Sequence, residues 1–238
     1  MTLDYEVYQS PFTWRYGSPE MRRIWSEANK RKLWRNIWVV LAEVQSMYGL
    51  VSAEQLRDLQ AHMDQVEVQR SLDIEAEIHH DLMAELKAFA ESAPIGGGIL
   101  HLGATSTDIE DNADVIRMAE SLDLLLEKMS RLLLSFAVQI EKWADTPLIA
   151  FTHIQPAEPS TFGYRFACYA QDLLADWVYL KERREKLCGK GFKGAVGTGA
   201  AFGELLGESR LSEFEKRLSK RLGIPFYLVT TQVYPRNV

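Results

Sequence analysis

The chain has 238 residues, of which 47% are hydrophobic and 25% are charged. These proportions are ordinary for a globular protein, and they exclude collagen-like, disordered and disulfide-stapled chains. The formal net charge of −6 argues against a nucleic acid partner, because phosphate backbones are bound by basic surfaces. No apolar run approaches the roughly 18–20 residues of a membrane span, and the first residues lack the pattern of a signal peptide. We therefore expect neither a membrane partner nor secretion.

The two cysteines indicate a compartment. Cys168 and Cys188 are predicted to share one helix, where they would stand about 30 Å apart at ~1.5 Å per residue. That separation is beyond the reach of a disulfide. Free thiols are typical of a reducing compartment, so we expect a cytoplasmic protein, with a redox role as the sharper alternative.

The first half of the chain is expected to form helices of ordinary length. Ser18 and Pro19 have the pattern of an N-cap followed by a first-turn proline. Helical spacing then continues to Gly49, with a break expected near Ser26. Three segments follow: a short helix opened by a capping-box pattern at 52–55, a helix over 71–91 and a glycine turn at 96–98.

The second half shows longer helical patterns. An apolar residue recurs every three or four positions from Leu122 to Trp143, and Thr107 with Glu110 forms a capping-box pattern. We therefore expect three helices, at 108–144, 160–188 and 209–222. A glycine-rich loop at 191–199 lies between the last two.

No segment of strand length alternates in steps of two, so the predicted fold class is all-α. We expect an N-terminal helical domain at 1–99, followed by part of a long helical bundle at 100–238. Two long helices cannot close a bundle alone, because each apolar stripe needs neighbours on more than one side. The chain is therefore expected to oligomerise through these helices, to be incomplete at its C-terminal side, or both.

Histidines mark three segments that could carry chemistry. The first is His79-His80-Asp81, within the predicted helix at 71–91. Adjacent helical side chains point about 100° apart, and this is not the i, i+4 spacing of a metal pair. A solvated polar face is the plain interpretation, and we predict no metal site.

The second segment places His101, Thr105 and Ser106 just ahead of the longest predicted helix. Free backbone N–H groups and the positive end of the helix dipole collect at such a start, so it favours an anion. Hydroxyls that only cap the helix are the alternative.

The third segment, residues 152–161, contains His153 and two prolines that hold the backbone extended. An imidazole fixed in such a loop suits proton transfer near neutral pH, and a purely structural histidine is the alternative. The loop at 191–199 has neither the dinucleotide nor the P-loop pattern, so it predicts close approach of the backbone to a ligand or to another helix. We predict no cofactor.

Together these segments resemble the fumarase/aspartase superfamily and, within it, the adenylosuccinate lyase family. Six matching segments occur in the family's order: RYGSPEM at 15–21, HDLMA at 80–84, HLGATSTD at 101–108, THIQPA at 152–157, KGAVGT at 193–198 and TQVYPR at 231–236. One such segment would be weak evidence, whereas six in order are specific for the superfamily and favour its purine branch.

The resemblance implies a β-elimination that releases fumarate from adenylosuccinate, giving AMP, and from the succinyl-carboxamide ribotide of purine biosynthesis. It implies that His153 is the general acid and that His80 is a second catalytic histidine that binds or orients the substrate. The other implied roles are in substrate binding: Thr105 and Ser106 for a carboxylate, His101, Arg15 and Tyr16 for the phosphate, and His79, Asp81 and Gln232 for further contacts.

The sequence departs from the family in one respect. The family's base is a serine on a loop with the signature S-S-x-M-P-x-K-x-N, which this sequence lacks. We therefore expect an N-terminal portion of a homotetrameric enzyme, with little activity alone. Two alternatives stay open. One is another superfamily lyase of the argininosuccinate or fumarate type, whose substrate offers no phosphate to Arg15 and Tyr16; the other is a non-catalytic helical fragment that only oligomerises.

Overall fold

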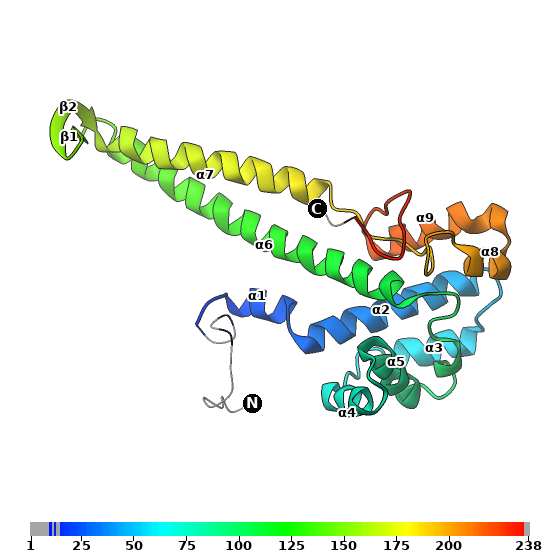
Figure 1. Cartoon of the computed structure of the whole chain (residues 1–238). Helices are drawn as coiled ribbons and strands as arrows, with labels where there is room; N and C mark the ends of the chain where they lie inside the picture. Colours follow the sequence, from blue (N-terminus) through cyan, green and yellow to red (C-terminus); the bar gives the residue numbers. More distant parts are fainter. Residues whose placement is uncertain (1–9, 11, 13–14, 236–238) are drawn as a thin grey trace. The chain divides into compact units, whose positions relative to one another are not determined.

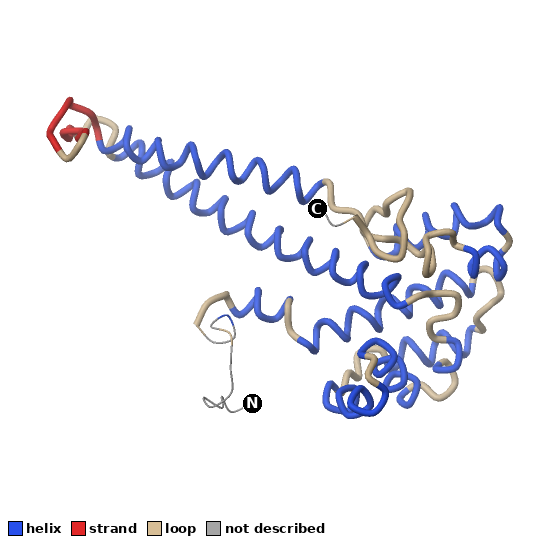
Figure 2. The backbone as a smooth tube through the Cα atoms, in the orientation of Figure 1, coloured by secondary structure: helices blue, strands red, loops and turns tan. Residues whose placement is uncertain are grey.

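The computed structural model describes residues 10, 12 and 15–235, and it consists almost entirely of helices and loops (Figure 2). The described residues form two compact units. The first unit runs up to Met118 and resumes at Leu187, and the second unit is Ala119–Lys186. The predominantly helical class is confirmed, while the predicted domain boundary at residue 99 stays a prediction.

Local capping signals set the first helices. Helix α1 (Pro19–Ile24) begins after Ser18, whose hydroxyl accepts a hydrogen bond from the Met21 N–H at 3.3 Å. Helix α2 (Glu27–Ser46) is capped in the same way by Ser26, so the expected break is confirmed. Helix α3 (Ala53–His62) has the reciprocal capping box that the 52–55 pattern predicts.

The single helix expected at 71–91 is wrong. The structure has α4 (Val68–Ile78) and α5 (Asp81–Ser92), separated by His79 and His80. His79 adopts a left-handed backbone with φ 55°, which ends α4 without a glycine. His80 is extended and accepts the Met83 N–H with its ring, so it caps α5.

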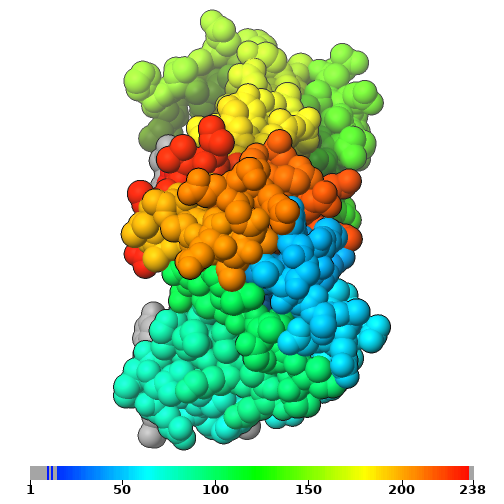
Figure 3. Space-filling model, turned by 90° about the vertical axis from the view of Figure 1, so that its right-hand side faces the viewer, coloured from blue at the N-terminus to red at the C-terminus, as the bar shows by residue number. Residues whose placement is uncertain are grey.

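The core of the first unit is built by α2, α5 and the first turns of α6 (Ser106–Lys142) with the elements that follow residue 187. Those later elements are α8 (Ala200–Leu206), the 3₁₀ turn η3 (Glu208–Arg210) and α9 (Leu211–Leu222). A second 3₁₀ turn, η2 (Gly97–Ile99), follows α5. Helix α9 packs on α2, and Figure 3 shows its residues (orange) meeting blue residues near position 50. Fully buried aromatic rings fill the centre: Trp38, Phe89, Phe192, Phe202 and Phe214.

The second unit is an antiparallel helix pair closed by a two-stranded hairpin (Figure 1). It consists of the later part of α6, strands β1 (Pro147–Thr152) and β2 (Gln155–Thr161), and α7 (Phe162–Glu185). The helices approach closely at Gly163, where a Cβ would lie 2.6 Å from the Ile140 carbonyl oxygen. A bond from the Trp177 ring to the Ser130 hydroxyl at 3.0 Å joins them further along.

The hairpin was not expected from the sequence. Its register pairs Thr152 with Gln155, so the turn consists of His153 and Ile154, with φ 48° and 64°. Two left-handed residues match a type I′ turn, which usually carries asparagine and glycine. The sequence therefore lacks the ordinary signal for this turn. The extended backbone predicted for 152–161 is confirmed at 155–161, but it is wrong at His153 and Ile154.

The two cysteines lie in different parts of the fold. Because α7 ends at Glu185, Cys188 lies beyond it, and the prediction that both cysteines share one helix is wrong. Both thiols are free. Within the described ranges, no helix combines the length and apolar character needed to cross a membrane.

Candidate functional site

The start of α6 is organised differently from the predicted capping box. The helix begins at Ser106, and the Thr105 N–H donates to an oxygen of Asp108 at 2.9 Å. Asp108 therefore takes the role expected of Glu110, two residues earlier along the helix. Thr105 and Ser106 consequently stand at the first turn, where an anion is favoured.

Asp108 also fixes the glycine-rich loop. Its fully buried carboxylate pairs with the equally buried ammonium of Lys190. It further accepts the backbone N–H groups of Lys193 at 3.1 Å and Gly194 at 3.2 Å. One carboxylate thus joins the first turn of α6 to residues 190–194.

Asn112, one turn further, holds the same loop. Its side-chain amide exchanges two hydrogen bonds with the backbone of Gly191, both at 3.1 Å. A Cβ at Gly189 would lie 2.4 Å from the Asn112 amide oxygen, so glycine is needed for this approach. Of the two uses predicted for the loop, the structure shows close approach to a helix.

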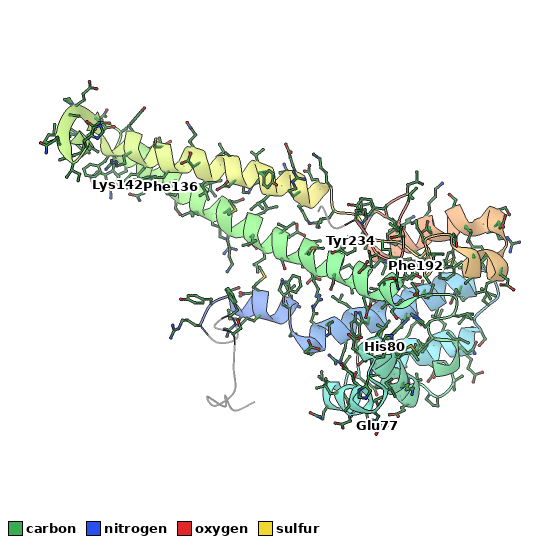
Figure 4. The ribbon with its side chains drawn as sticks, viewed as in Figure 1. Glu77, His80, Phe136, Lys142, Phe192 and Tyr234 are labelled. Atoms are coloured by element: carbon green, nitrogen blue, oxygen red, sulfur yellow. The ribbon has the colours of Figure 1, made fainter. Side chains whose placement is uncertain are left out.

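His80 and Ser106 meet at this helix start. The ring Nε2 of His80 lies 3.4 Å from the Ser106 hydroxyl, while its Nδ1 accepts the Met83 N–H at 3.5 Å. Nε2 is thus the ring nitrogen that faces the Ser106 hydroxyl. His80 is exposed (labelled in Figure 4), so its ring is accessible to a ligand.

The neighbours of His80 lie where α4 ends and α5 begins. His79 is exposed at the left-handed end of α4. Asp81 accepts the Leu82 N–H at 2.8 Å, within the first turn of α5. The structure thus gives both residues a local role beside His80.

His101 is partly buried against Trp38. The indole N–H of Trp38 donates to its Nδ1 at 3.1 Å, and the rings meet edge to face. Since the indole is only a donor, Nδ1 is unprotonated and Nε2–H remains as a donor for a ligand. Burial lowers the pKa of His101, with the charge of His80 acting in the same direction and that of Asp108 opposing both. His101 is therefore a neutral hydrogen-bond donor near pH 7.

Glu110 has a perturbed acidity and was expected only as part of a helix cap. Burial raises its pKa to about 7, and the negative charges of Asp81, Asp111 and Asp114 add to the shift, against the opposing charge of Lys30. It lies one turn after Ser106 on the same face of α6. A carboxyl that exchanges its proton near neutral pH thus lies close to Asp81.

Gln232 is brought to the same helix start by its backbone. Its carbonyl accepts the Thr107 hydroxyl, and the Tyr234 N–H donates to Asp111 at 2.9 Å. Figure 4 shows Tyr234 near the first turns of α6. The Gln232 side chain itself is exposed. Arg236, the last residue of the sixth matching segment, lies outside the described residues.

The remaining predicted site residues are not joined to this cluster by a described contact. Arg15 and Tyr16 are exposed ahead of α1, and the Tyr16 ring contacts Phe12. His153 is exposed in the hairpin turn of the second unit. Among the described residues, no group of three or more histidine, cysteine or acidic side chains is arranged to hold a metal ion.

A sequence signal for the missed residues exists in retrospect. Asp108, Asp111 and Asn112 recur at steps of three and four on α6, among the buried positions Ile109 and Ala113. Polar residues on a buried helix face need partners, and these find theirs in loops about 80 to 120 residues away.

Curated proteins of similar sequence indicate the family of the chain. Adenylosuccinate lyase of Schistosoma mansoni is 36% identical in an alignment 240 residues long, gaps included, that covers 99% of this chain and 50% of that protein. The protein of the same name in Saccharomyces cerevisiae is 33% identical in an alignment 242 residues long, with the same shares covered. The chain therefore spans about half the length of these relatives.

Solved structures give the same picture. A 3-carboxy-cis,cis-muconate lactonizing enzyme of Pseudomonas putida superposes with a TM-score of 0.82 and 26% identity, over 92% of this chain and 50% of that one. A fumarate lyase of Mesorhizobium sp. BNC1 gives a TM-score of 0.80 and 25% identity, over 90% and 51%. The superfamily expected from the six segments is confirmed. A family model described as "Lyase" matches residues 14–232, and the chain therefore belongs to this lyase family.

Proposed function

We propose that the chain contributes to an adenylosuccinate lyase, which eliminates fumarate from adenylosuccinate and from the succinyl-carboxamide ribotide of purine biosynthesis. The observation that carries the proposal is the contact of His80 with Ser106 at the start of α6, next to His101. The relatives named adenylosuccinate lyase match almost the whole chain, which supports this branch over others.

The first unit would bind the substrate's anionic groups. Thr105 and Ser106 present hydroxyls at a helix start that favours a carboxylate, and that carboxylate gains charge as the adjacent carbon loses its proton. The neutral His101 would donate from Nε2 to the phosphate end, and Gln232 would add a contact. Arg15 and Tyr16 are exposed and are proposed to take the phosphate.

The histidines would handle the proton at the leaving nitrogen. We assign His153 as the general acid and His80 as the group that orients the substrate, with His79 and Asp81 beside it. The type I′ turn fixes the backbone of His153, which favours a defined position for its ring.

Self-association is part of the proposal. In the second unit only Ala119, Ser121 and Gly163 are buried, while large apolar side chains along α6 and α7 are exposed. Two helices cannot cover one another on every side, so other copies of this unit would do so, as in a homotetramer. The two free thiols fit the cytoplasm.

We further propose that residues 1–238 alone turn over little substrate, because the serine-loop signature of the family does not occur in this sequence. Release of fumarate by the pure chain at the rate of a complete enzyme would contradict this part of the proposal. It would leave the binding roles in place.

Calorimetric titration tests the binding roles. The chain is expected to bind adenylosuccinate and AMP but not argininosuccinate. Ser106→Ala should weaken adenylosuccinate at least tenfold, equivalent to about 1.4 kcal/mol, whereas Ser135→Ala, further along α6, should not. Arg15→Ala should weaken AMP and adenylosuccinate but not fumarate.

The other readings predict different results. Binding of argininosuccinate would favour another lyase branch, whose substrate has no phosphate. The same conclusion would follow if Arg15→Ala left the affinity for every ligand unchanged. Absence of binding by all these ligands, in a chain that self-associates, would favour a non-catalytic oligomerisation fragment.

A further inference from the structure

Two residues of α6 hold the loop that carries Gln232. The Thr107 hydroxyl donates to the Gln232 carbonyl, and an Asp111 oxygen accepts the Tyr234 N–H at 2.9 Å. Thr107 and Asp111 are four residues apart, so they lie on one face of the helix. The two bonds therefore act on backbone groups on either side of residue 233.

The loop, defined here as residues 227–235, is also fixed before Gln232. A Cβ added at Gly197 would lie 1.9 Å from the Thr230 carbonyl oxygen, so the glycine-rich loop packs directly on it. Thr230 is 7% exposed and Tyr234 8% exposed. The backbone is thus held at both ends of a short stretch whose middle side chain, Gln232, faces solvent.

This attachment brings the backbone of Gln232 to the first turn of α6. Thr107 directly follows Ser106, whose hydroxyl lies 3.4 Å from the ring of His80. The carbonyl of Gln232 is bonded to that next residue, so the backbone from which the Gln232 side chain extends lies at the first turn of α6. A glutamine amide donates and accepts hydrogen bonds, which suits a carboxylate and its neighbouring nitrogen.

We propose that Thr107 and Asp111 are positioning residues, which do not touch the ligand but set where the Gln232 amide meets it. The proposal rests on the proposed function, because it takes the ligand at Ser106 and His80 to be a succinyl-bearing nucleotide. Their effect on the ligand would pass through Gln232 alone.

A purely structural role for the two bonds makes a different prediction. In that case Thr107→Val would lower stability and leave affinity unchanged, or would weaken all ligands independently of Gln232. A positioning role predicts that Thr107→Val and Gln232→Ala weaken binding by similar factors and that the double variant is no weaker than Gln232→Ala, because both remove one interaction.

The experiment is a double-variant cycle on the full 238-residue chain with adenylosuccinate as the probe. We expect Thr107→Val to weaken binding about five- to tenfold and Thr107→Ser, which keeps the hydroxyl, to restore it. Asp111→Leu should behave like Thr107→Val, while Asp111→Asn retains an acceptor for the Tyr234 N–H and should bind nearly as the wild type does.

Amide hydrogen exchange at Tyr234 provides a readout without ligand. The Tyr234 amide should be protected in the wild type and in Asp111→Asn, and should exchange faster in Asp111→Leu. An unprotected Tyr234 amide in the wild type, or additive losses in the cycle, would overturn the positioning role while the proposed function stands. A protected Tyr234 amide with no adenylosuccinate binding by the wild type would instead contradict the proposed function, and the inference that rests on it.

Discussion

The two compact units have the same helical composition but bury their side chains very differently. The first unit has a continuous core of large side chains, including Trp38, Phe89 and Phe214. The second unit buries only Ala119, Ser121 and Gly163, although it is 68 residues long. Helical spacing alone therefore does not make a self-sufficient domain, because the second unit leaves most of its apolar stripe uncovered.

The two units also differ in whether their ion pairs are buried or exposed. The first unit contains fully buried ions, such as Asp108 with Lys190 and Glu85 with Arg35, which only a closed core can enclose. In the second unit the bidentate pair of Arg184 with Asp123 is exposed. Removing an ion pair should therefore lower the free energy of unfolding by different amounts in the two units.

The largest expected effect comes from breaking the buried pair. Asp108→Ala leaves the Lys190 ammonium buried without its carboxylate, which should lower the free energy of unfolding by about 3–5 kcal/mol. Asp123→Ala, the matched change in the second unit, should cost about 0–1 kcal/mol because that pair is solvated. Urea unfolding followed by circular dichroism measures both.

A second variant keeps that result interpretable. Asp108→Leu combined with Lys190→Met removes both charges and should recover the part of the loss that comes from the unpaired ammonium. The part due to the backbone N–H groups of Thr105, Lys193 and Gly194, which lose their acceptor in both variants, should remain. If Asp108→Ala and Asp123→Ala cost the same small amount, the contrast between the units in charge burial is wrong.

The next effect concerns the uncovered apolar surface. Leu134 on α6 is 68% exposed in the second unit, and Leu134→Glu should weaken self-association at least 30-fold, about 2 kcal/mol. Leu72→Glu on α4 is the matched control in the first unit, where the side chain is 41% exposed and no partner copy is expected. Sedimentation velocity across a concentration series reports both. Equal weakening by the two variants would remove the special role of the second unit.

A smaller effect depends on pH. The pKa of Glu110 is raised from 4.5 to about 7, mainly by burial. Below 4.5 the carboxyl is protonated in both the folded and the unfolded chain, so it contributes nothing. As the pH rises to 7 only the unfolded chain ionises freely, so stability is lost across this window.

Glu110→Gln should therefore stabilise the chain at pH 8 by about 1–2 kcal/mol, less than the full shift allows because the side chain is only partly buried. The gain should vanish at pH 4. Glu141→Gln, at an exposed position in the second-unit part of α6, should change stability little at either pH. Denaturant midpoints of the variants at the two pH values measure these changes in stability. A stability gain for Glu110→Gln that persists at pH 4 would show that it does not come from the raised pKa.

The sequence predicted the parts of this fold that depend on local signals. Ser18, Ser26 and the box at 52–55 cap helices as expected, because a cap needs only a few neighbouring residues. The break at His79 and the turn at His153 were missed, since each uses a left-handed histidine where glycine or asparagine is the usual signal. Their backbone conformations depend on the elements that they join, α4 with α5 and β1 with β2, rather than on the residue type.

Some residues of the candidate site were likewise predicted from the sequence, and others were missed. His80, His101 and Ser106 were predicted by resemblance, and the structure brings His80 and Ser106 together. Asp108, Asn112 and Asp111 were missed as site-building residues, because their partners are backbone groups of distant loops. A spacing rule can show that such polar residues face the interior, but it cannot say which loop they will hold.

The smallest effect compares helix caps in the two units. Ser52 accepts the Gln55 N–H in α3, and Thr161 accepts the Tyr164 N–H in α7, both at 3.2 Å. Ser52→Ala and Thr161→Ala should each remove about 1 kcal/mol of local helix stability.

In the first unit α3 packs against the core, so the loss should appear in the free energy of global unfolding. In the second unit, the first turn of α7 packs on α6 at Gly163 but has no core of large buried side chains behind it, so we expect local opening instead. Hydrogen exchange at Tyr164 should speed up in Thr161→Ala while the denaturant midpoint stays unchanged. A midpoint lowered equally by both variants would mean that the second unit unfolds together with the first, as one cooperative structure.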